Sequence, residues 1–140
     1  MQGTPEMMQA APSYGFAPVE IYEFLEQRIE AALAAGIPRE RIAVDPGFGF
    51  GKTVQHNLAL VNFAAMFHGL GVPVLIGVSR KSSIAAMSSG EDSDNRLAGS
   101  LGLAMATVVQ GCQLLRVHDV AETRQALAIQ TALAGGADAG

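Results

Sequence analysis

Three short apolar segments set the strongest limit on what this chain can fold into, because stretches with helical spacing of apolar residues separate them. The segments are residues 41–44, 74–78 and 112–117, and they recur about every 35 residues. Helices are expected from Pro18 to the Gly36 stop, over 57–70, over 82–87, over 95–110 and over 119–134. This alternation predicts parallel strands joined by crossover helices, and therefore an α/β fold.

Parallel strands with crossover helices form either a doubly wound sheet or a (β/α) barrel. In a barrel, the loops after the C-terminal ends of the strands line the active face, and all three charged loops of this chain follow predicted strands. A complete barrel closes eight strands over about 250 residues, whereas this chain has 140 residues and only three predicted strands. We therefore expect an incomplete part of a barrel, with Met1 an internal methionine. A self-contained small α/β domain is the alternative.

The loop after the first strand is rich in glycine and begins with an acid. It reads Asp45-Pro46-Gly47-Phe48-Gly49-Phe50-Gly51-Lys52-Thr53. Glycine allows positive φ and a close approach of backbone to ligand, so the loop is expected to contact a ligand. The spacing fits neither a phosphate-binding P-loop nor a dinucleotide fingerprint. A tight strand-to-helix turn without a ligand is the plainer alternative.

Charged side chains in the three loops have the chemistry of a binding site. The Asp45 carboxylate could accept two parallel N–H bonds from a flat amino-pyrimidinone edge, and Lys81 offers a charge and three donors. Arg116 and His118 alternate along one strand end, so both should point the same way, and the pair suits a pyrophosphate. Asp119 should point away and cap the last helix. The alternatives are a loop-bracing acid, a solvated lysine and an Arg–Asp pair at the barrel rim.

The composition argues against several classes of protein. The formal net charge is −4, so neither nucleic acid nor an anionic membrane surface is an expected partner. The sequence has no apolar run of about 18 residues and no signal-peptide pattern at its start. The lone Cys112 is expected to be a buried thiol, which suits a reducing cytoplasm. His56 and His68 belong to no recognisable motif and are expected on helix surfaces, and no cluster has metal-ligand spacing.

Four motifs, in this order, closely resemble those of dihydropteroate synthase. They are Asp45-Pro46-Gly47-Phe48-Gly49-Phe50-Gly51-Lys52, Gly77-Val78-Ser79-Arg80-Lys81-Ser82, Arg96-Leu97-Ala98-Gly99-Ser100 and Arg116-Val117-His118-Asp119-Val120. The opening Met1-Gln2-Gly3-Thr4-Pro5 is similar to the segment after that enzyme's fifth barrel strand. The resemblance implies that residues 1–134 are strands six to eight of a (β/α)₈ TIM barrel with their helices, and that 135–140 are a flexible tail.

The resemblance also implies a reaction of folate biosynthesis. The amine of p-aminobenzoate attacks 6-hydroxymethyl-7,8-dihydropterin pyrophosphate, giving 7,8-dihydropteroate and pyrophosphate. Mg²⁺ would be held mainly by phosphate oxygens and by residues outside this chain. The complete protein would be a cytoplasmic homodimer. A non-catalytic half-barrel and another pterin-binding barrel, such as a methyltetrahydrofolate methyltransferase, are the alternatives; the glycine loop and Ser79-Arg80-Lys81-Ser82 favour the synthase over the methyltransferase.

The family's site residues map onto the three loops of this sequence. Those matching Asp45 and Lys81 bind the pterin ring, and Gly47 is also expected to bind substrate. Those matching Arg116 and His118 bind the pyrophosphate and are the expected catalytic residues. Positions lining the family's p-aminobenzoate site match Phe50, Arg80 and Ser82.

Overall fold

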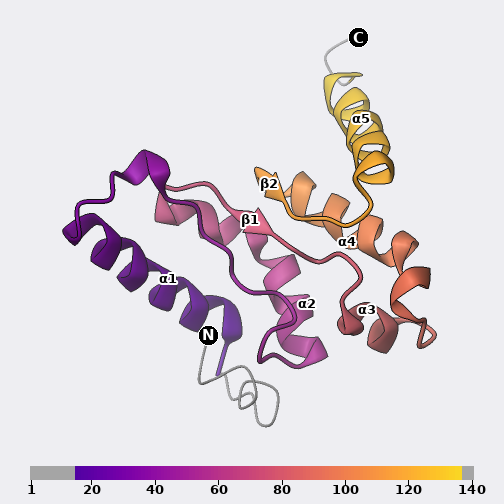
Figure 1. Ribbon diagram of the computed structural model, residues 1–140, viewed down its shortest axis with the longest axis horizontal. Coiled ribbons are helices and arrows are strands. Elements are labelled where there is room, and N and C mark those ends of the chain that lie inside the picture. Colours follow the sequence, from indigo (N-terminus) through magenta and orange to yellow (C-terminus); the bar gives the residue numbers. More distant parts are fainter. Residues whose placement is uncertain (1–14, 137–140) are drawn as a thin grey trace.

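Three extended segments lie side by side in the order in which they occur in the chain (Figure 1). The computed structural model describes residues 15–136, which excludes the opening motif 1–5 and residues 137–140 of the expected tail. Strand β1 (Leu75–Ile76) pairs in parallel with β2 (Leu114–Leu115), with Leu75 opposite Leu114 and Ile76 opposite Leu115. On the other side of β1, Val44 forms a parallel bridge with Val74. The predicted α/β class with parallel strands is confirmed.

The helices form a row that contacts in chain order. Helix α1 packs against α2, α2 against α4, and α4 against α5. A row of helices that contact one another in chain order, beside strands in sequential order, is compatible with part of a (β/α) barrel. The elements are α1 (Ala17–Ala34), α2 (Val54–Asn62), α3 (Ser82–Met87), α4 (Leu97–Val109) and α5 (Val120–Gly136), with 3₁₀ segments η1 (Arg39–Arg41), η2 (Ala64–Leu70) and η3 (Ser93–Asn95).

The strands expected over 74–78 and 112–117 are present but shorter, as β1 and β2, and two further elements differ more. The strand expected over 41–44 is reduced to the Val44 bridge, because η1 turns the chain through Arg41 first. The helix expected over 57–70 begins earlier, at Val54, because Thr53 and His56 form a reciprocal capping box. His56 lies on a helix, as expected, and is also a capping residue, which the sequence did not predict.

The same helix also changes its winding. It ends at Asn62 and continues as the tighter η2, which Gly71 closes with a φ of +68°. Helical spacing in the sequence predicts an inner face made of Leu58, Val61, Ala65 and Phe67. In the structure Val61 and Phe67 are buried, whereas Leu58 is half-buried and Ala65 is exposed.

The core lies between the extended segments and the helix row. Its fully buried side chains come from the glycine loop, α2, η2 and the β1 segment: Phe48, Leu60, Phe67, Val74 and Val78. Val74, Ile76 and Val78 of the β1 segment lie on one face and are all buried, whereas Leu75 on the other face is only partly buried. The Cys112 thiol is also buried, as expected, and that burial raises its pKa.

Helix α5 projects away from the other elements (Figure 1). Its apolar side chains Ile129 and Leu133 are 61% and 68% exposed, and Val109 at the end of α4 is 67% exposed. None of the described helices has the length and apolar content needed to cross a membrane. The exposed apolar side chains of α5 and of the end of α4 form a surface that no described element covers.

His68 links two helical segments that are far apart in the sequence. Its Nε2 atom lies 2.9 Å from the carbonyl oxygen of Gln110, which links η2 to the end of α4. His68 lies in a helical segment, as expected, but it also has a partner that the sequence did not indicate. No sequence signal pointed to this contact, since the two residues are 42 positions apart.

Candidate functional site

The glycine loop turns three times through the left-handed region. Gly47, Gly49 and Gly51 have φ values of +73°, +86° and +57°. This region strains residues that carry a Cβ, so the alternating glycines are required by the backbone, as the sequence predicted. At Gly49 an added Cβ would also lie 2.7 Å from the Cδ atom of Lys81. The loop therefore approaches the next loop of the site at van der Waals contact.

Two side chains hold this loop in shape. The ammonium of Lys52 donates to the carbonyl oxygens of Gly47 and Phe50, at 2.7 and 2.9 Å. The buried Asn57 accepts from the backbone N–H of Gly49 at 2.8 Å and donates to Ser83 Oγ at 3.0 Å. Sequence reasoning missed Asn57. Its signal is a polar residue in line with the buried Leu60, Val61 and Ala64 of the same helical face.

Asp45 stands at the start of the loop with its carboxylate exposed. One carboxylate oxygen accepts from the backbone N–H of Gly47 at 2.8 Å. The negative charge is close enough to raise the pKa values of Lys52 and Lys81, against the stronger effect of burial. Asp45 thus braces the loop and still has acceptor capacity for a ligand.

Lys81 lies across the glycine loop. Its ammonium donates to the carbonyl oxygen of Phe48 and stands 4.2 Å from the centre of the Phe50 ring. Burial lowers the pKa of Lys81 from its ordinary 10.5 to about 8; the charge of Asp45 opposes this shift, and that of Arg116 adds to it. The pKa of Lys52 is likewise lowered to about 8, chiefly by burial. Both lysines of the chain therefore have pKa values only slightly above neutral pH.

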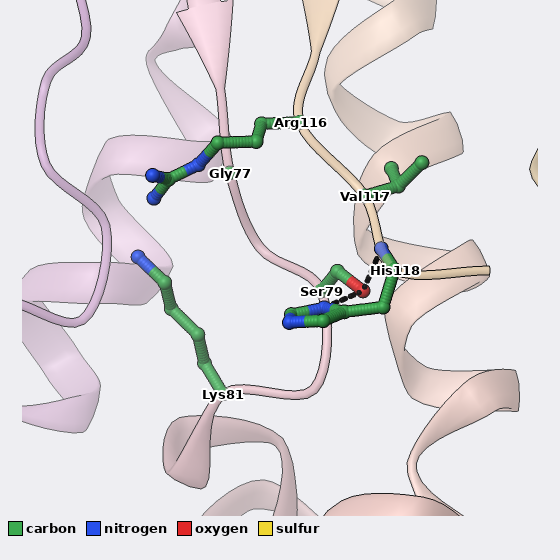
Figure 2. Close-up of a pocket in the computed structure, with 6 residues that line it drawn as sticks. All are labelled: Gly77, Ser79, Lys81, Arg116, Val117 and His118. Carbon is green, nitrogen blue, oxygen red and sulfur yellow. Dashed lines mark hydrogen bonds between the residues drawn. The ribbon is translucent and has the colours of Figure 1, made fainter. Parts of the chain in front are cut away.

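A pocket of about 240 Å³ opens between the ends of β1 and β2 (Figure 2). We call it the Lys81–Arg116 pocket, and its lining residues are Gly77, Ser79, Lys81, Arg116, Val117 and His118. The charged ends of Lys81 and Arg116 approach one another in it (Figure 2). The absence of a side chain at Gly77 makes room for Arg116, whose Nε would lie 3.2 Å from an added Cβ. Arg116 and His118 both line this pocket, as their alternation predicted.

His118 is the third polar side chain of the pocket, and two hydrogen bonds with Ser79 fix its position. Ser79 Oγ lies 3.2 Å from the backbone nitrogen of His118 and 2.9 Å from its Nδ1 atom. Figure 2 shows the serine on one side of the imidazole and the other ring nitrogen on the side of Lys81. Two cations and an imidazole line one small pocket, and this chemistry suits an anionic ligand.

Arg80 points away from this pocket. Its guanidinium forms a two-pronged ion pair with Asp119, at 3.1 and 2.5 Å, and a further contact with Asp94 at 3.1 Å. Hydrogen bonding from Arg80 lowers the pKa of the Asp119 carboxyl below its usual value. Asp119 opens α5 through its carbonyl oxygen, which accepts from Thr123. The carboxylate expected to cap the helix is thus bound by Arg80.

The backbone of Arg80 is held as firmly as its side chain. Its φ is +56°, a left-handed value that is uncommon for residues with a Cβ. Its N–H donates to Ser100 Oγ at 2.9 Å, and Arg96 donates to its carbonyl oxygen at 2.9 Å. The Arg96–Ser100 motif therefore acts by fixing the turn that presents Lys81, a role the sequence did not reveal.

The three residues expected to share a p-aminobenzoate site lie in different surroundings. Phe50 lies beneath the Lys81 ammonium, Ser82 lines a second pocket of about 310 Å³, and Arg80 lines neither pocket. The second pocket lies between the glycine loop and α3, and Lys52 and Ser83 also line it. The described residues therefore bring Lys81, Arg116 and His118 together, while Asp45 stands at the neighbouring loop.

The charge of this site does not suit a metal cation. Within residues 15–136, no three His, Cys, Asp or Glu side chains gather closely enough to hold a metal ion. The Lys81–Arg116 pocket presents cationic groups, which repel Mg²⁺ and attract its usual anionic partners. The residues present do not fit a resident metal.

Comparison with known proteins gives a consistent result. A family model described as "Pterin binding enzyme" matches residues 1–118. The Escherichia coli K12 dihydropteroate synthase is 42% identical over 129 residues, covering 92% of this chain and 45% of the relative. Among solved structures, the Yersinia pestis dihydropteroate synthase in complex with a sulfonamide drug superposes with a TM-score of 0.93 at 38% identity, covering 97% of this chain and 49% of that one.

A third relative is known with bound substrates. The Thermus thermophilus dihydropteroate synthase, solved with 4-aminobenzoate and, separately, with 6HMPPP, superposes with a TM-score of 0.88 at 43% identity. The match to the 4-aminobenzoate complex covers 93% of this chain and 52% of that one. The chain thus spans about half the length of the proteins it matches.

Proposed function

The chain belongs to the family of pterin-binding enzymes, and we propose that it forms the C-terminal part of a dihydropteroate synthase. In this proposal residues 1–134 supply strands six to eight of the barrel with their helices, and the missing strands come from a preceding segment. The observation that supports it most is the convergence of Lys81, Arg116 and His118 in one pocket at the carboxyl ends of neighbouring parallel strands.

The proposed reaction needs no side-chain nucleophile. The nitrogen of p-aminobenzoate forms a bond to the methylene carbon of 6-hydroxymethyl-7,8-dihydropterin pyrophosphate. The bond from that carbon to oxygen breaks, pyrophosphate leaves with the electron pair, and the amine loses a proton. Arg116 and His118 stabilise the charge that develops on the leaving group, and the site positions the two reactants.

Asp45 and Lys81 hold the pterin ring in this proposal. The exposed Asp45 carboxylate offers acceptor oxygens at the entrance of the glycine loop, where Gly47 lets the backbone approach closely. Lys81 supplies donors between this loop and Arg116.

The p-aminobenzoate site is the least complete part of the site. We assign it to the Phe50 ring, which lies beneath the Lys81 ammonium, and to Ser82, which follows Lys81 in the chain and lines the second pocket. The ion pairs of Arg80 with Asp119 and Asp94 favour an indirect role for that residue, through the turn that carries Lys81 and Ser82. Mg²⁺ would be held mainly by the phosphate oxygens of the substrate and by residues outside this chain.

The partners and location of the complete protein are also proposals. A homodimer would cover the apolar side chains that α4 and α5 expose, among them Val109 and Leu133. A buried, unmodified Cys112 thiol suits a reducing cytoplasm. A non-catalytic half-barrel is the second candidate function, since the chain spans about half of its relatives' length.

A chimeric barrel tests the proposed activity. Residues 1–140 are fused behind the N-terminal part of the Escherichia coli relative and assayed with both substrates and Mg²⁺. We expect turnover of roughly 1 s⁻¹ or more for the chimera and none for the isolated chain. In the chimera, Arg116→Ala should lower kcat at least about 100-fold, whereas the matched surface variant Arg124→Ala should leave it unchanged. A folded but inactive chimera, or a fully active Arg116→Ala, would contradict the proposal.

A further inference from the structure

Ser79 makes two hydrogen bonds to His118, and together they determine which nitrogen of the imidazole ring carries the proton. The backbone N–H of His118 can only donate, so Ser79 Oγ accepts that bond at 3.2 Å. The same oxygen lies 2.9 Å from His118 Nδ1. Ser79 is 6% exposed, and within residues 15–136 its hydroxyl contacts no third partner.

The hydroxyl hydrogen decides between the two tautomers of the imidazole. If Nδ1 carried the proton, Ser79 would accept twice and its own hydrogen would have no acceptor among the described residues, which is costly in a largely buried side chain. If Nδ1 is bare, the hydroxyl donates to it and every group is satisfied. The neutral ring then carries its proton on Nε2, the nitrogen on the side of Lys81 (Figure 2).

We propose that Ser79 is a positioning residue that fixes His118 in the Nε2–H tautomer and so supplies the Lys81–Arg116 pocket with a third hydrogen-bond donor. The inference rests on the proposed function in taking the ligand of this pocket to be the leaving pyrophosphate. A lone pair at Nε2 would repel a phosphate oxygen, whereas an N–H at that atom donates to it without requiring a charged imidazole. Lys81, Arg116 and His118 then present donors only.

The tautomer is read directly from the ¹⁵N chemical shifts of the histidine rings. We would record them for the ¹⁵N-labelled 140-residue chain at about pH 8, where a free imidazole is neutral, and assign His118 with a His118→Gln variant. The wild type should show a bare Nδ1 and a protonated Nε2. Ser79→Ala should give a mixture of both tautomers, and Ser79→Thr, which keeps the hydroxyl, should restore the wild-type shifts.

Thr107→Val is the matched control, because it removes another buried hydroxyl, one that donates to Ala104 far along α4. It should leave the His118 shifts unchanged. A protonated Nδ1 in the wild type, or unchanged His118 shifts in Ser79→Ala, would overturn the proposal. If Ser79→Ala does not fold, the wild type and Ser79→Thr still decide the matter, because a mixed tautomer in either one contradicts it.

Titration with inorganic pyrophosphate separates this inference from the proposed function. Ser79→Ala should bind pyrophosphate about 3- to 10-fold more weakly than the wild type, as expected for the loss of one oriented hydrogen bond. Equal affinity with altered His118 shifts would show that the tautomer does not matter for the anion and would refute the second half of the proposal. No binding to the wild type would refute the anion site of the proposed function, while the tautomer result would stand.

Discussion

Arg80 and Asp119 join the loops that follow β1 and β2, through two hydrogen bonds of 3.1 and 2.5 Å between the guanidinium and the carboxylate. Each residue is next to a proposed ligand-binding side chain, Lys81 in one loop and His118 in the other. The fork geometry of such a pair fixes orientation as well as distance. The two halves of the anion pocket therefore share one rigid support.

Asp45→Asn and Arg116→Ala should fail in different ways. In a completed barrel, Asp45→Asn replaces one acceptor oxygen with a donor, so 6-hydroxymethylpterin should bind more weakly by on the order of 2–3 kcal/mol. Arg116→Ala should leave pterin binding intact and weaken pyrophosphate binding. Calorimetric titration of each variant with each ligand measures this. An Arg116→Ala that lost pterin affinity while binding pyrophosphate normally would show that the division of the site is wrong.

Gly49→Ala should destabilise the glycine loop and displace Lys81. Its φ of +86° disfavours a Cβ, and the added atom would lie 2.7 Å from Lys81 Cδ. We expect a loss of about 1–3 kcal/mol in the free energy of unfolding, measured in urea. Gly102→Ala is the matched control, because that glycine lies in α4 with open space around it, and it should gain roughly 0.5–1 kcal/mol. Equal effects at both positions would contradict the close approach of the two loops.

The stability of the fold should rise with pH above neutrality. Lys52 and Lys81 have pKa values of about 8 in the folded chain against an ordinary 10.5, so between these values the unfolded state binds more protons. The free energy of unfolding then increases with pH in this window, and below about pH 8 the fold bears the full cost of two charged, partly buried lysines. Urea denaturation from pH 7 to 10 measures the slope. The double variant Lys52→Met/Lys81→Met should flatten it; an equal slope in that variant would assign the effect to other groups.

The isolated chain should associate reversibly. Val109, Ile129 and Leu133 are more than half exposed, and β2 leaves one edge of the small sheet unpaired among the described residues. Exposed apolar side chains beside an open strand edge favour contact with a second molecule. Sedimentation at several concentrations should show dimers or larger species, and Ile129→Glu with Leu133→Glu should shift them toward monomer. A concentration-independent monomer with a sharp melt would instead support a self-contained small domain.

Local patterns predicted much of this fold because the boundaries of the elements depend on nearby residues. Pro18 opens α1, and Gly71 closes the helical segment before β1, as their conformational preferences require. The Thr53–His56 capping box and the 3₁₀ winding of η2 were not predicted. Histidine is not a usual partner in such a box, and the periodicity of apolar residues does not distinguish a 3₁₀ turn from an α-helical one.

The site was predictable where single side chains carry the chemistry, and not where contacts between distant residues decide it. Strand alternation placed Arg116 and His118 in one pocket correctly. Nothing near Arg80 in the sequence shows that Asp119, 39 positions away, binds its guanidinium. The links from Asn57 to Gly49 and Ser83 likewise depend on the packing of α2 against α3.

The left-handed backbone of Arg80 restricts how this position can change over evolutionary time. Glycine would relax the φ of +56° but would remove the cation that contacts Asp94 and Asp119. Any other residue with a Cβ would keep the strained backbone and lose the planar fork that fits Asp119. Every single substitution therefore exchanges one defect for another. Replacing this arginine without loss of function would therefore require simultaneous changes at position 80 and at Asp94 or Asp119, which lie far apart in the sequence.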